Sequence, residues 1–372
     1  MLRPSSETEL AEVVRGAREP LFVQGNGTKS GMLRPVQAAE TLSLSGMRGI
    51  TLYAPNELVM RARAGTRLAE IEAALAERGQ QMIAEPSHLF GPEQTLGGIV
   101  GANISGPRRI SGGAMRDHVL GVRCVNGTGE VLNFGGRVLK NVTGLDVAKL
   151  LTGSFGTLAV LSEITFKVLP VTEATGTIVV HGLDAPAGVA AMSAGLGSPF
   201  SVSGAAYVPA RRAAYLRIED FSPSVAYRCE KLRQQFGEAE VLNTEDSQAL
   251  WRELRDAAVL PAGEALWRVS VAPSRGPSVL QAAEAVGLAG YLDWGGGLVW
   301  LTGPASEAAH GAVCDAARAA GGVWWLLRAP EPLRAAVAVV PPETQAFAAL
   351  RRRVQQSFDP RGIFNPLKLQ AA

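Results

Sequence analysis

Residues 21–31 read LFVQGNGTKSG, a short apolar run that leads directly into a loop with three glycines. Glycine admits positive φ angles, so backbone N–H groups can converge on an anion, and the hydroxyls of Thr28 and Ser30 can donate to phosphate. A GxGxxG loop requires glycine where Ser30 stands, and a Walker loop requires glycine immediately before Lys29. The loop is therefore a candidate pyrophosphate site of another kind, with a simple turn between two strands as the alternative.

A second glycine-rich stretch, TLGGIVGANISG, occupies residues 95–106. Its small residues allow the backbone to press against a flat or phosphorylated ligand, whereas a tightly packed helix start is the alternative. We expect Gly97 and Gly98 to lie where the backbone approaches a pyrophosphate too closely for any Cβ atom. Further polar and glycine-rich segments follow within 60 residues, at Arg116-Asp117, Lys140-Asn141 and 153–157 (GSFGT), and together they indicate one site.

The rest of the chain predicts an α+β protein with two lobes, as its 372 residues suggest. We expect a helix over 6–17, strands at 21–24, 119–125 and 130–134, a helix over 144–151, a strand pair in LAVLSEITFKVLP, and a long functional loop over 85–115. From residue 175 a strand, helix, strand, strand, helix order appears twice, which predicts a duplicated ferredoxin-like sheet as a cap over 175–330. The segment 345–368 is expected to return to the first lobe.

Composition excludes several classes of function. The net charge is only +2 and no block of five Lys or Arg residues occurs, so nucleic acid is not an expected partner. No signal peptide or apolar run of membrane-spanning length is present, which predicts a cytoplasmic protein. The three cysteines lack CxxC spacing and the four histidines lack HxH, HExxH or HxxxH spacing, so we expect neither an iron–sulfur cluster nor a bound metal.

Taken in order, these motifs resemble the PCMH-type FAD-binding domain of the vanillyl-alcohol oxidase and p-cresol methylhydroxylase superfamily. The segments that carry the resemblance are VQGNGTKSG, GPEQTLGGIVGANISGP, LKNVTGLDVAKLLTGSFGTLAVLSEITFKVLP and FDPRGIFNP. Within this superfamily, SGPRR followed by MRDHVLG and LKNVTGLD is most similar to the smaller FAD-binding subunits of bacterial glycolate oxidases. The resemblance implies an FAD-binding domain at 1–170, a ferredoxin-like cap at 171–344, and a segment at 345–372 that returns to the first domain.

The resemblance also implies site residues. The pyrophosphate would contact Gln24, Gly25, Asn26, Gly27, Thr28, Lys29, Ser30, Thr95, Leu96, Gly97 and Gly98. The ribityl chain or isoalloxazine would contact Ala102, Asn103 and Ser105. The remaining cofactor surface would contact Gly153, Ser154, Gly156, Thr157 and Ile164. Relatives with covalent flavin carry a histidine in the first loop, and residues 24–31 contain none, so non-covalent FAD is expected. Arg116 or Lys140 could stabilise negative charge on the reduced flavin, with a structural ion pair as the alternative.

The resemblance implies that the chain is an FAD-binding subunit that acts beside a larger catalytic flavin subunit and an iron–sulfur subunit. The complex would oxidise a 2-hydroxy acid such as glycolate. Any association with the inner face of the membrane would occur through these partners. The His-rich metal motif of larger 2-hydroxy-acid dehydrogenases is missing after residue 171. Two alternatives stay open. One is a self-sufficient glycolate or D-lactate dehydrogenase in which Arg109 or Arg217 binds the substrate carboxylate. The other is a scaffold subunit without redox function.

Overall fold

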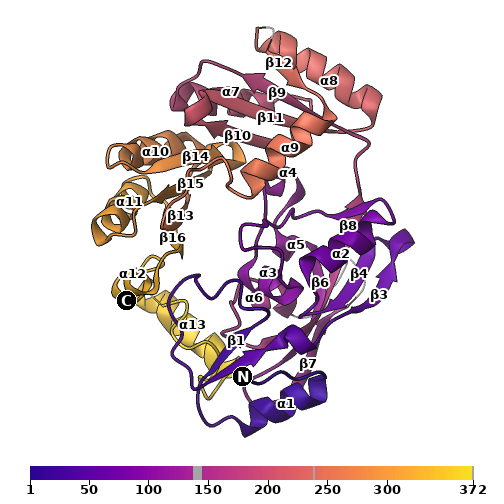
Figure 1. Ribbon diagram of the computed structural model, residues 1–372, viewed down its shortest axis with the longest axis vertical. Coiled ribbons are helices and arrows are strands. Elements are labelled where there is room, and N and C mark those ends of the chain that lie inside the picture. Colours follow the sequence, from indigo (N-terminus) through magenta and orange to yellow (C-terminus); the bar gives the residue numbers. More distant parts are fainter. Residues whose placement is uncertain (137–144, 238, 371–372) are drawn as a thin grey trace.

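The computed structural model describes residues 1–136, 145–237 and 239–370, which form two lobes (Figure 1). A six-stranded sheet is the centre of the first lobe, with strand order β3-β4-β8-β6-β7 and β5 paired to β8. A separate parallel pair, β1 and β2, lies beside it. The strands of this lobe are β1 (Leu21–Gln24), β2 (Glu40–Ser43), β3 (Ile50–Ala54), β4 (Val59–Arg63), β5 (Gln80–Met82), β6 (Val119–Val125), β7 (Val131–Gly135) and β8 (Val160–Pro170).

The central strand β8 corrects the sequence-based prediction of a strand pair. It is one continuous strand of eleven residues that pairs with β4, β5 and β6. Its first nine residues are buried except Glu163 and Lys167, because partners cover both of its edges. No glycine, proline or asparagine interrupts it before Pro170, so nothing in the backbone chemistry favours a turn.

The described residues of the first lobe form six α-helices: α1 (Glu7–Gly16), α2 (Leu68–Ala76), α3 (Leu96–Ala102), α4 (Arg109–Gly112), α5 (Met115–His118) and α6 (Val147–Leu151). The predicted helix start at Ser6 is confirmed, since its Oγ accepts the N–H of Glu9 at 3.2 Å. The glycine-rich stretch predicted as one long loop over 85–115 instead contains α3 and α4. Thr95 caps α3, so short helices follow directly on the loops that shape the site.

The cap is an eight-stranded sheet with strand order β12-β9-β11-β10-β14-β15-β13-β16. Its strands are β9 (Ala174–Val180), β10 (Gly204–Val208), β11 (Ala213–Asp220), β12 (Glu240–Leu242), β13 (Ala265–Ser270), β14 (Ala289–Asp293), β15 (Leu298–Gly303) and β16 (Val323–Arg328). Its helices are α7 (Ala185–Leu196), α8 (Ser222–Gln235), α9 (Thr244–Arg255), α10 (Gly276–Glu284) and α11 (Glu307–Ala319). Each half follows the βαββαβ order, and the halves join where Tyr207 of β10 pairs with Leu292 of β14. The predicted ferredoxin-like duplication is confirmed.

The last part of the chain leaves the cap through α12 (Glu331–Ala336) and α13 (Gln345–Phe358). It then runs back to β1, where the N–H of Leu21 donates to the carbonyl of Ile363 at 2.8 Å. Phe364 is fully buried against the first lobe. Among the described residues, no helix combines the length and apolar character needed to cross a bilayer.

Candidate cofactor site

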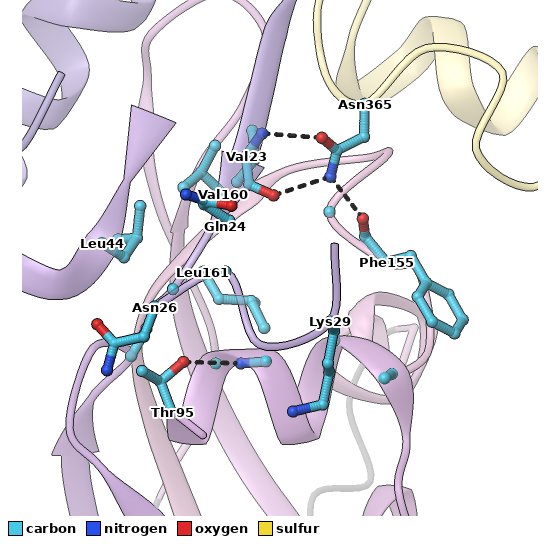
Figure 2. Close-up of a pocket in the computed structure, with 18 of the residues that line it drawn as sticks. Val23, Gln24, Asn26, Lys29, Leu44, Thr95, Phe155, Val160, Leu161 and Asn365 are labelled. Carbon is cyan, nitrogen blue, oxygen red and sulfur yellow. Dashed lines mark hydrogen bonds between the residues drawn. The ribbon is translucent and has the colours of Figure 1, made fainter. Parts of the chain in front are cut away.

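A groove in the first lobe brings the two glycine-rich loops together (Figure 2). Together with the open solvent at its mouth, it encloses about 790 Å³ of space that no atom fills. Its walls come from the loop after β1, the start of α3, the segment 155–161 and the C-terminal segment. The lining residues are Phe22, Val23, Gln24, Gly25, Asn26, Gly27, Thr28, Lys29, Ser30, Leu44, Ala64, Thr95, Gly97, Gly98, Gly101, Ala102, Phe155, Gly156, Ala159, Val160, Leu161, Asn365 and Lys368.

The first glycine loop lines the groove along its whole length from Gln24 to Ser30. Gly27 has a φ of +75°, in the region that favours glycine. A Cβ atom on Gly25 would lie 2.1 Å from Oγ1 of Thr95, so the two loops touch at this point. The loop is held in place by Ser43, whose Oγ donates to the Gly25 carbonyl at 2.8 Å, and by Asn26, whose amide donates to a backbone carbonyl before α3.

The second loop contributes Thr95, Gly97 and Gly98 to the groove. The hydroxyl of Thr95 accepts the N–H of Gly98 at 3.3 Å and so defines the first turn of α3. Gly97 serves packing as well, because a Cβ atom there would lie 2.9 Å from Cβ of Ala64 and 3.0 Å from its carbonyl oxygen. A Cβ atom on Gly98 would make only ordinary contacts, the nearest 3.4 Å from Thr95. The two adjacent glycines therefore have different roles.

Seven residues implied by the resemblance are not among the described lining residues of the groove: Leu96, Asn103, Ser105, Gly153, Ser154, Thr157 and Ile164. Leu96 and Ile164 are fully buried in the core. The side-chain oxygen of Asn103 accepts the backbone N–H of Arg116 at 3.0 Å, and Oγ of Ser105 accepts a backbone N–H from the start of α5 at 2.9 Å. Asn103 and Ser105 thus shape the turn that follows α3, at the end of the wall that Ala102 lines.

The segment 153–157 supplies Phe155 and Gly156 to the lining. Gly153 and Gly156 both have positive φ angles, +88° and +67°. Ser154 and Thr157 donate their hydroxyls to nearby carbonyls, at 2.8 Å and 2.7 Å, and so close the turn on itself. The predicted glycines here are needed for backbone geometry, while Phe155 provides the contact surface.

Neither candidate for a catalytic charge is among the described lining residues of the groove. Arg116 is half exposed, is absent from the described lining residues and lies 3.8 Å from Asp117 in an exposed ion pair. Lys140, with Asn141, lies outside the described residues. The self-sufficient enzyme was expected to use Arg109 or Arg217 as a carboxylate clamp, but Arg217 is 2% exposed and already paired with Glu85 and Glu219. Three of its N–H groups already donate to Ser203 and Glu85.

The C-terminal segment adds two site residues that the sequence analysis did not find, Asn365 and Lys368. The side chain of Asn365 accepts the N–H of Val23 at 2.8 Å and donates to the carbonyls of Val23 and Phe155 at 3.1 Å and 2.8 Å (Figure 2). It therefore holds β1 and the segment 153–157 at a fixed separation. Lys368 is buried and donates to the carbonyl of Met32 at 3.0 Å.

Two lysines give the groove its electrostatic character. Nζ of Lys29 donates to Oε1 of Gln94 at 2.7 Å and lies 5.2 Å from the ring centroid of Phe90. Burial lowers the pKa of Lys29 to about 7. Burial, followed by the positive charge of Arg334, lowers the pKa of Lys368 to about 8. Neither lysine forms an ion pair within the described part of the chain, so the groove has two buried cation positions that an anionic ligand can stabilise.

The residues present fit FAD. Glycine loops and two lysines suit a pyrophosphate, whereas Val23, Leu44, Val160 and Leu161 offer apolar walls for rings. None of the described lining residues is a histidine or cysteine that could form a bond to flavin. Over the described residues no cluster of three potential metal ligands occurs, so the metal-free expectation stays a prediction.

The fold and the groove define a class of protein, the FAD-binding flavoproteins. The family described as "FAD binding domain" matches residues 1–135. Among solved structures, alkyldihydroxyacetonephosphate synthase has the same fold, with a TM-score of 0.71 at 16% sequence identity over 99% of this chain and 76% of that one. The predicted fold, a PCMH-type FAD-binding lobe with an α+β cap, is confirmed, and the cofactor is FAD.

Similarity to known proteins reaches beyond the fold. The glycolate oxidase subunit GlcE of Escherichia coli K12 is 36% identical over 358 residues, which cover 95% of this chain and 93% of that subunit. A D-lactate dehydrogenase of Archaeoglobus fulgidus is 32% identical over 174 residues, 46% of this chain and 38% of that enzyme. The chain belongs to the GlcE family of glycolate oxidase subunits.

Proposed function

We propose that this chain is the FAD-binding subunit of a glycolate oxidase-like complex that converts a 2-hydroxy acid into a 2-oxo acid. The observation that supports it most strongly is the similarity to GlcE over nearly the whole chain, in a molecule whose groove fits FAD. The D-lactate dehydrogenase relative supports the same reaction class, FAD-dependent oxidation at a CH–OH group. We place the FAD-binding domain at 1–170 with 345–372, the cap at 171–344, and the complex in the cytoplasm or at the inner face of the membrane.

A bound FAD would supply the hydride-accepting chemistry that oxidation of the hydroxyl-bearing carbon requires. The chain's own residues bind and orient the cofactor. Lys29 and Lys368 place positive charge in the groove, the two glycine loops present backbone N–H groups, and Asn365 fixes the spacing of β1 and 153–157. Because the described lining residues include neither histidine nor cysteine, we propose a non-covalent complex from which acid precipitation releases all flavin.

The function can be tested by anaerobic reduction of the bound flavin. The FAD-loaded chain alone is expected to lose its visible absorption slowly or not at all with glycolate, and rapidly once the larger flavin subunit is supplied. The reason is that the described residues contain no metal-ligand cluster of the kind expected for independent oxidation. Glycerol, which lacks a carboxylate, serves as the control. Rapid bleaching of the chain alone would establish the self-sufficient dehydrogenase, and a chain that binds no FAD would establish the scaffold.

The affinity for FAD is expected to fall as the pH rises above 7. Below pH 7 Lys29 is already protonated, but above pH 7 it must take up a proton when the negatively charged pyrophosphate binds and raises its pKa again. The dissociation constant should therefore rise by up to about tenfold per pH unit. Titration between pH 6 and pH 9 measures this. In Lys29→Met the affinity should be weaker at pH 6 and flat up to about pH 8, where Lys368 begins to deprotonate. A wild-type affinity that is equal at both ends would contradict the role of Lys29.

A further inference from the structure

One face of the cap sheet carries a row of aromatic residues with a single arginine. Tyr291 pairs with Trp300, Trp300 with Arg268, and Arg268 with Trp325, across strands β14, β15, β13 and β16. Residues directly opposite each other in neighbouring strands share a face of the sheet. The ring centroid of Trp325 lies 5.5 Å from that of Phe155, which lines the FAD groove. This face of the cap therefore looks toward the groove.

Arg268 is a partly buried cation that makes no direct contact with a carboxylate in the described ranges. Its Nε is buried and has no hydrogen-bond partner, and no ion pair joins the side chain to a carboxylate in the described ranges. Its guanidinium lies 5.1 Å and 5.4 Å from the ring centroids of Trp294 and Trp300. Asp293 and Tyr291 act electrostatically on Arg268, but both make hydrogen bonds to other groups. Asp293 accepts the N–H of Trp294 at 2.7 Å, and the hydroxyl of Tyr291 donates to a backbone carbonyl at 2.7 Å.

A second arginine lies against the same indole. The guanidinium of Arg109, which comes from α4 in the first lobe, is 4.5 Å from the ring centroid of Trp294. The indole Nε1–H of Trp294 donates to the Gly106 carbonyl at 3.1 Å and so fixes the ring in place. Burial, followed by the charge of Arg109, lowers the pKa of Arg268 to about 10, so the two positive charges oppose one another. The arrangement brings two cations to one small volume between the lobes.

Two neighbouring arginines of the same region are paired with carboxylates. Arg108 and Arg217 each contact both Glu85 and Glu219. An uncompensated buried charge is costly, and a guanidinium presents a planar set of donors that matches a carboxylate. The carboxylate of a ligand would supply a matching negative charge.

We propose that Arg268 and Arg109 bind the carboxylate of a small organic acid between the cap and the FAD groove. The anion site itself depends only on the two arginines and Trp294. Its assignment to the 2-hydroxy acid that is oxidised rests on the proposed function. The site gives the cap a direct role, because it holds the acid on the side of the sheet that faces the groove through Trp325 and Phe155.

Calorimetric titration of the full chain with oxalate, with and without FAD, tests the site. Oxalate carries carboxylates but has no C–H bond to oxidise. We expect saturable binding to the wild type, a dissociation constant raised roughly 10- to 100-fold in Arg268→Gln and in Arg109→Gln, and partial recovery in Arg268→Lys. Arg252→Gln, at an exposed arginine of α9, is the matched control and should bind as the wild type does.

The proposal is overturned if the wild type does not bind oxalate, or if Arg268→Gln and Arg109→Gln bind it as tightly as the wild type does. If Arg268→Gln does not fold, Arg109→Gln decides the question, because Arg109 is half-buried on a short surface helix. Oxalate binding to the apoprotein that depends on these arginines, without flavin reduction by any 2-hydroxy acid in the presence of the larger subunit, would support the anion site and reject the proposed function. The two failures are therefore distinguishable.

Discussion

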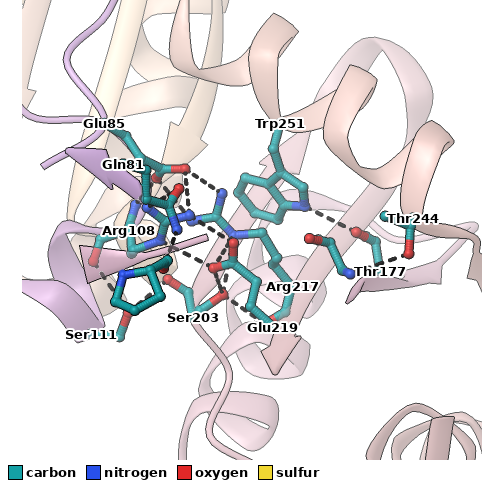
Figure 3. A network of polar contacts seen from close by, with 12 residues as sticks. Gln81, Glu85, Arg108, Ser111, Thr177, Ser203, Arg217, Glu219, Thr244 and Trp251 are labelled. Atoms are coloured by element: carbon teal, nitrogen blue, oxygen red, sulfur yellow. Dashed lines mark hydrogen bonds and ion pairs between the residues drawn. The ribbon is translucent and has the colours of Figure 1, made fainter. Parts of the chain in front are cut away.

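Replacement of Glu85 by alanine is expected to lower the free energy of unfolding by about 3–5 kcal/mol. Glu85 belongs to the first lobe and binds Arg217 of the cap through two hydrogen bonds, of 2.8 Å and 3.0 Å (Figure 3). Arg108, also of the first lobe, binds Glu219 of the cap at 2.7 Å and 3.2 Å. Each glutamate thus faces both arginines, and the four side chains are only 2% to 16% exposed. Removal of one carboxylate leaves an arginine buried without sufficient negative charge.

The same network predicts the response to acid. Burial opposes ionisation of Glu219, but Arg217 and Arg108 outweigh this effect and lower its pKa to about 2. The pKa of Glu85 is lowered for the same reason. A carboxyl whose pKa is depressed in the folded state stabilises it above the unfolded pKa and loses that contribution as the pH falls toward the folded pKa. The wild type should therefore lose stability between about pH 4 and pH 2, and Glu85→Ala should lose less over that interval.

Urea unfolding at pH 7 and pH 3 measures both effects. Asp315→Ala is the matched control, because Asp315 and Arg318 form an ion pair on α11 in which both side chains are more than half exposed. Such a pair contributes roughly 0–1 kcal/mol. A Glu85→Ala protein as stable as the Asp315→Ala protein would show that the network does not hold the cap to the first lobe.

Local patterns predicted those parts of the fold that local chemistry determines. The capping serine at residue 6, the apolar run before the first glycine loop and the doubled βαββαβ order each depend on neighbouring residues, and the structure contains all of them. The interpretation of β8 as a strand pair was wrong. Strands of eleven residues are uncommon, which favoured a division into two. The single strand forms because strands distant in the sequence pair with both of its edges. Burial from partners far along the chain is invisible to periodicity.

The site divides in the same way. The glycine loops can be recognised from their composition. Asn365, in contrast, bonds to Val23 across 342 positions, and no local pattern predicts that contact. The difference between Arg217 and Arg268 is equally hidden, since both stand in apolar strands of the cap and only tertiary contacts show which one is paired. The sequence can therefore identify charged residues as candidates for a site, but only the tertiary contacts show which of them are free to bind a ligand.

The substitutions Gly98→Val and Gly97→Val are expected to affect different properties: the first should weaken FAD binding, and the second should lower stability. A Cβ atom on Gly98 would lie 3.4 Å from Oγ1 of Thr95 and 3.6 Å from Nζ of Lys29, so the fold accepts it, but the added methyl groups would occupy the groove beside that ammonium. We expect folded protein whose FAD dissociation constant is raised by about 100-fold, equivalent to roughly 3 kcal/mol. The φ of Gly98 is not positive, so the backbone conformation there does not itself require glycine.

Gly97→Val should instead destabilise the apoprotein by about 1–3 kcal/mol, because its Cβ atom would lie 2.9 Å and 3.0 Å from atoms of Ala64 on the adjacent segment. Thermal melts of both apoproteins, combined with FAD titration of the folded fraction, separate loss of stability from loss of affinity. Gly98→Ala, which adds a single methyl group, should give an intermediate affinity. If Gly98→Val melts early yet binds FAD as the wild type does, then Gly98 serves helix packing and the pyrophosphate does not lie against it.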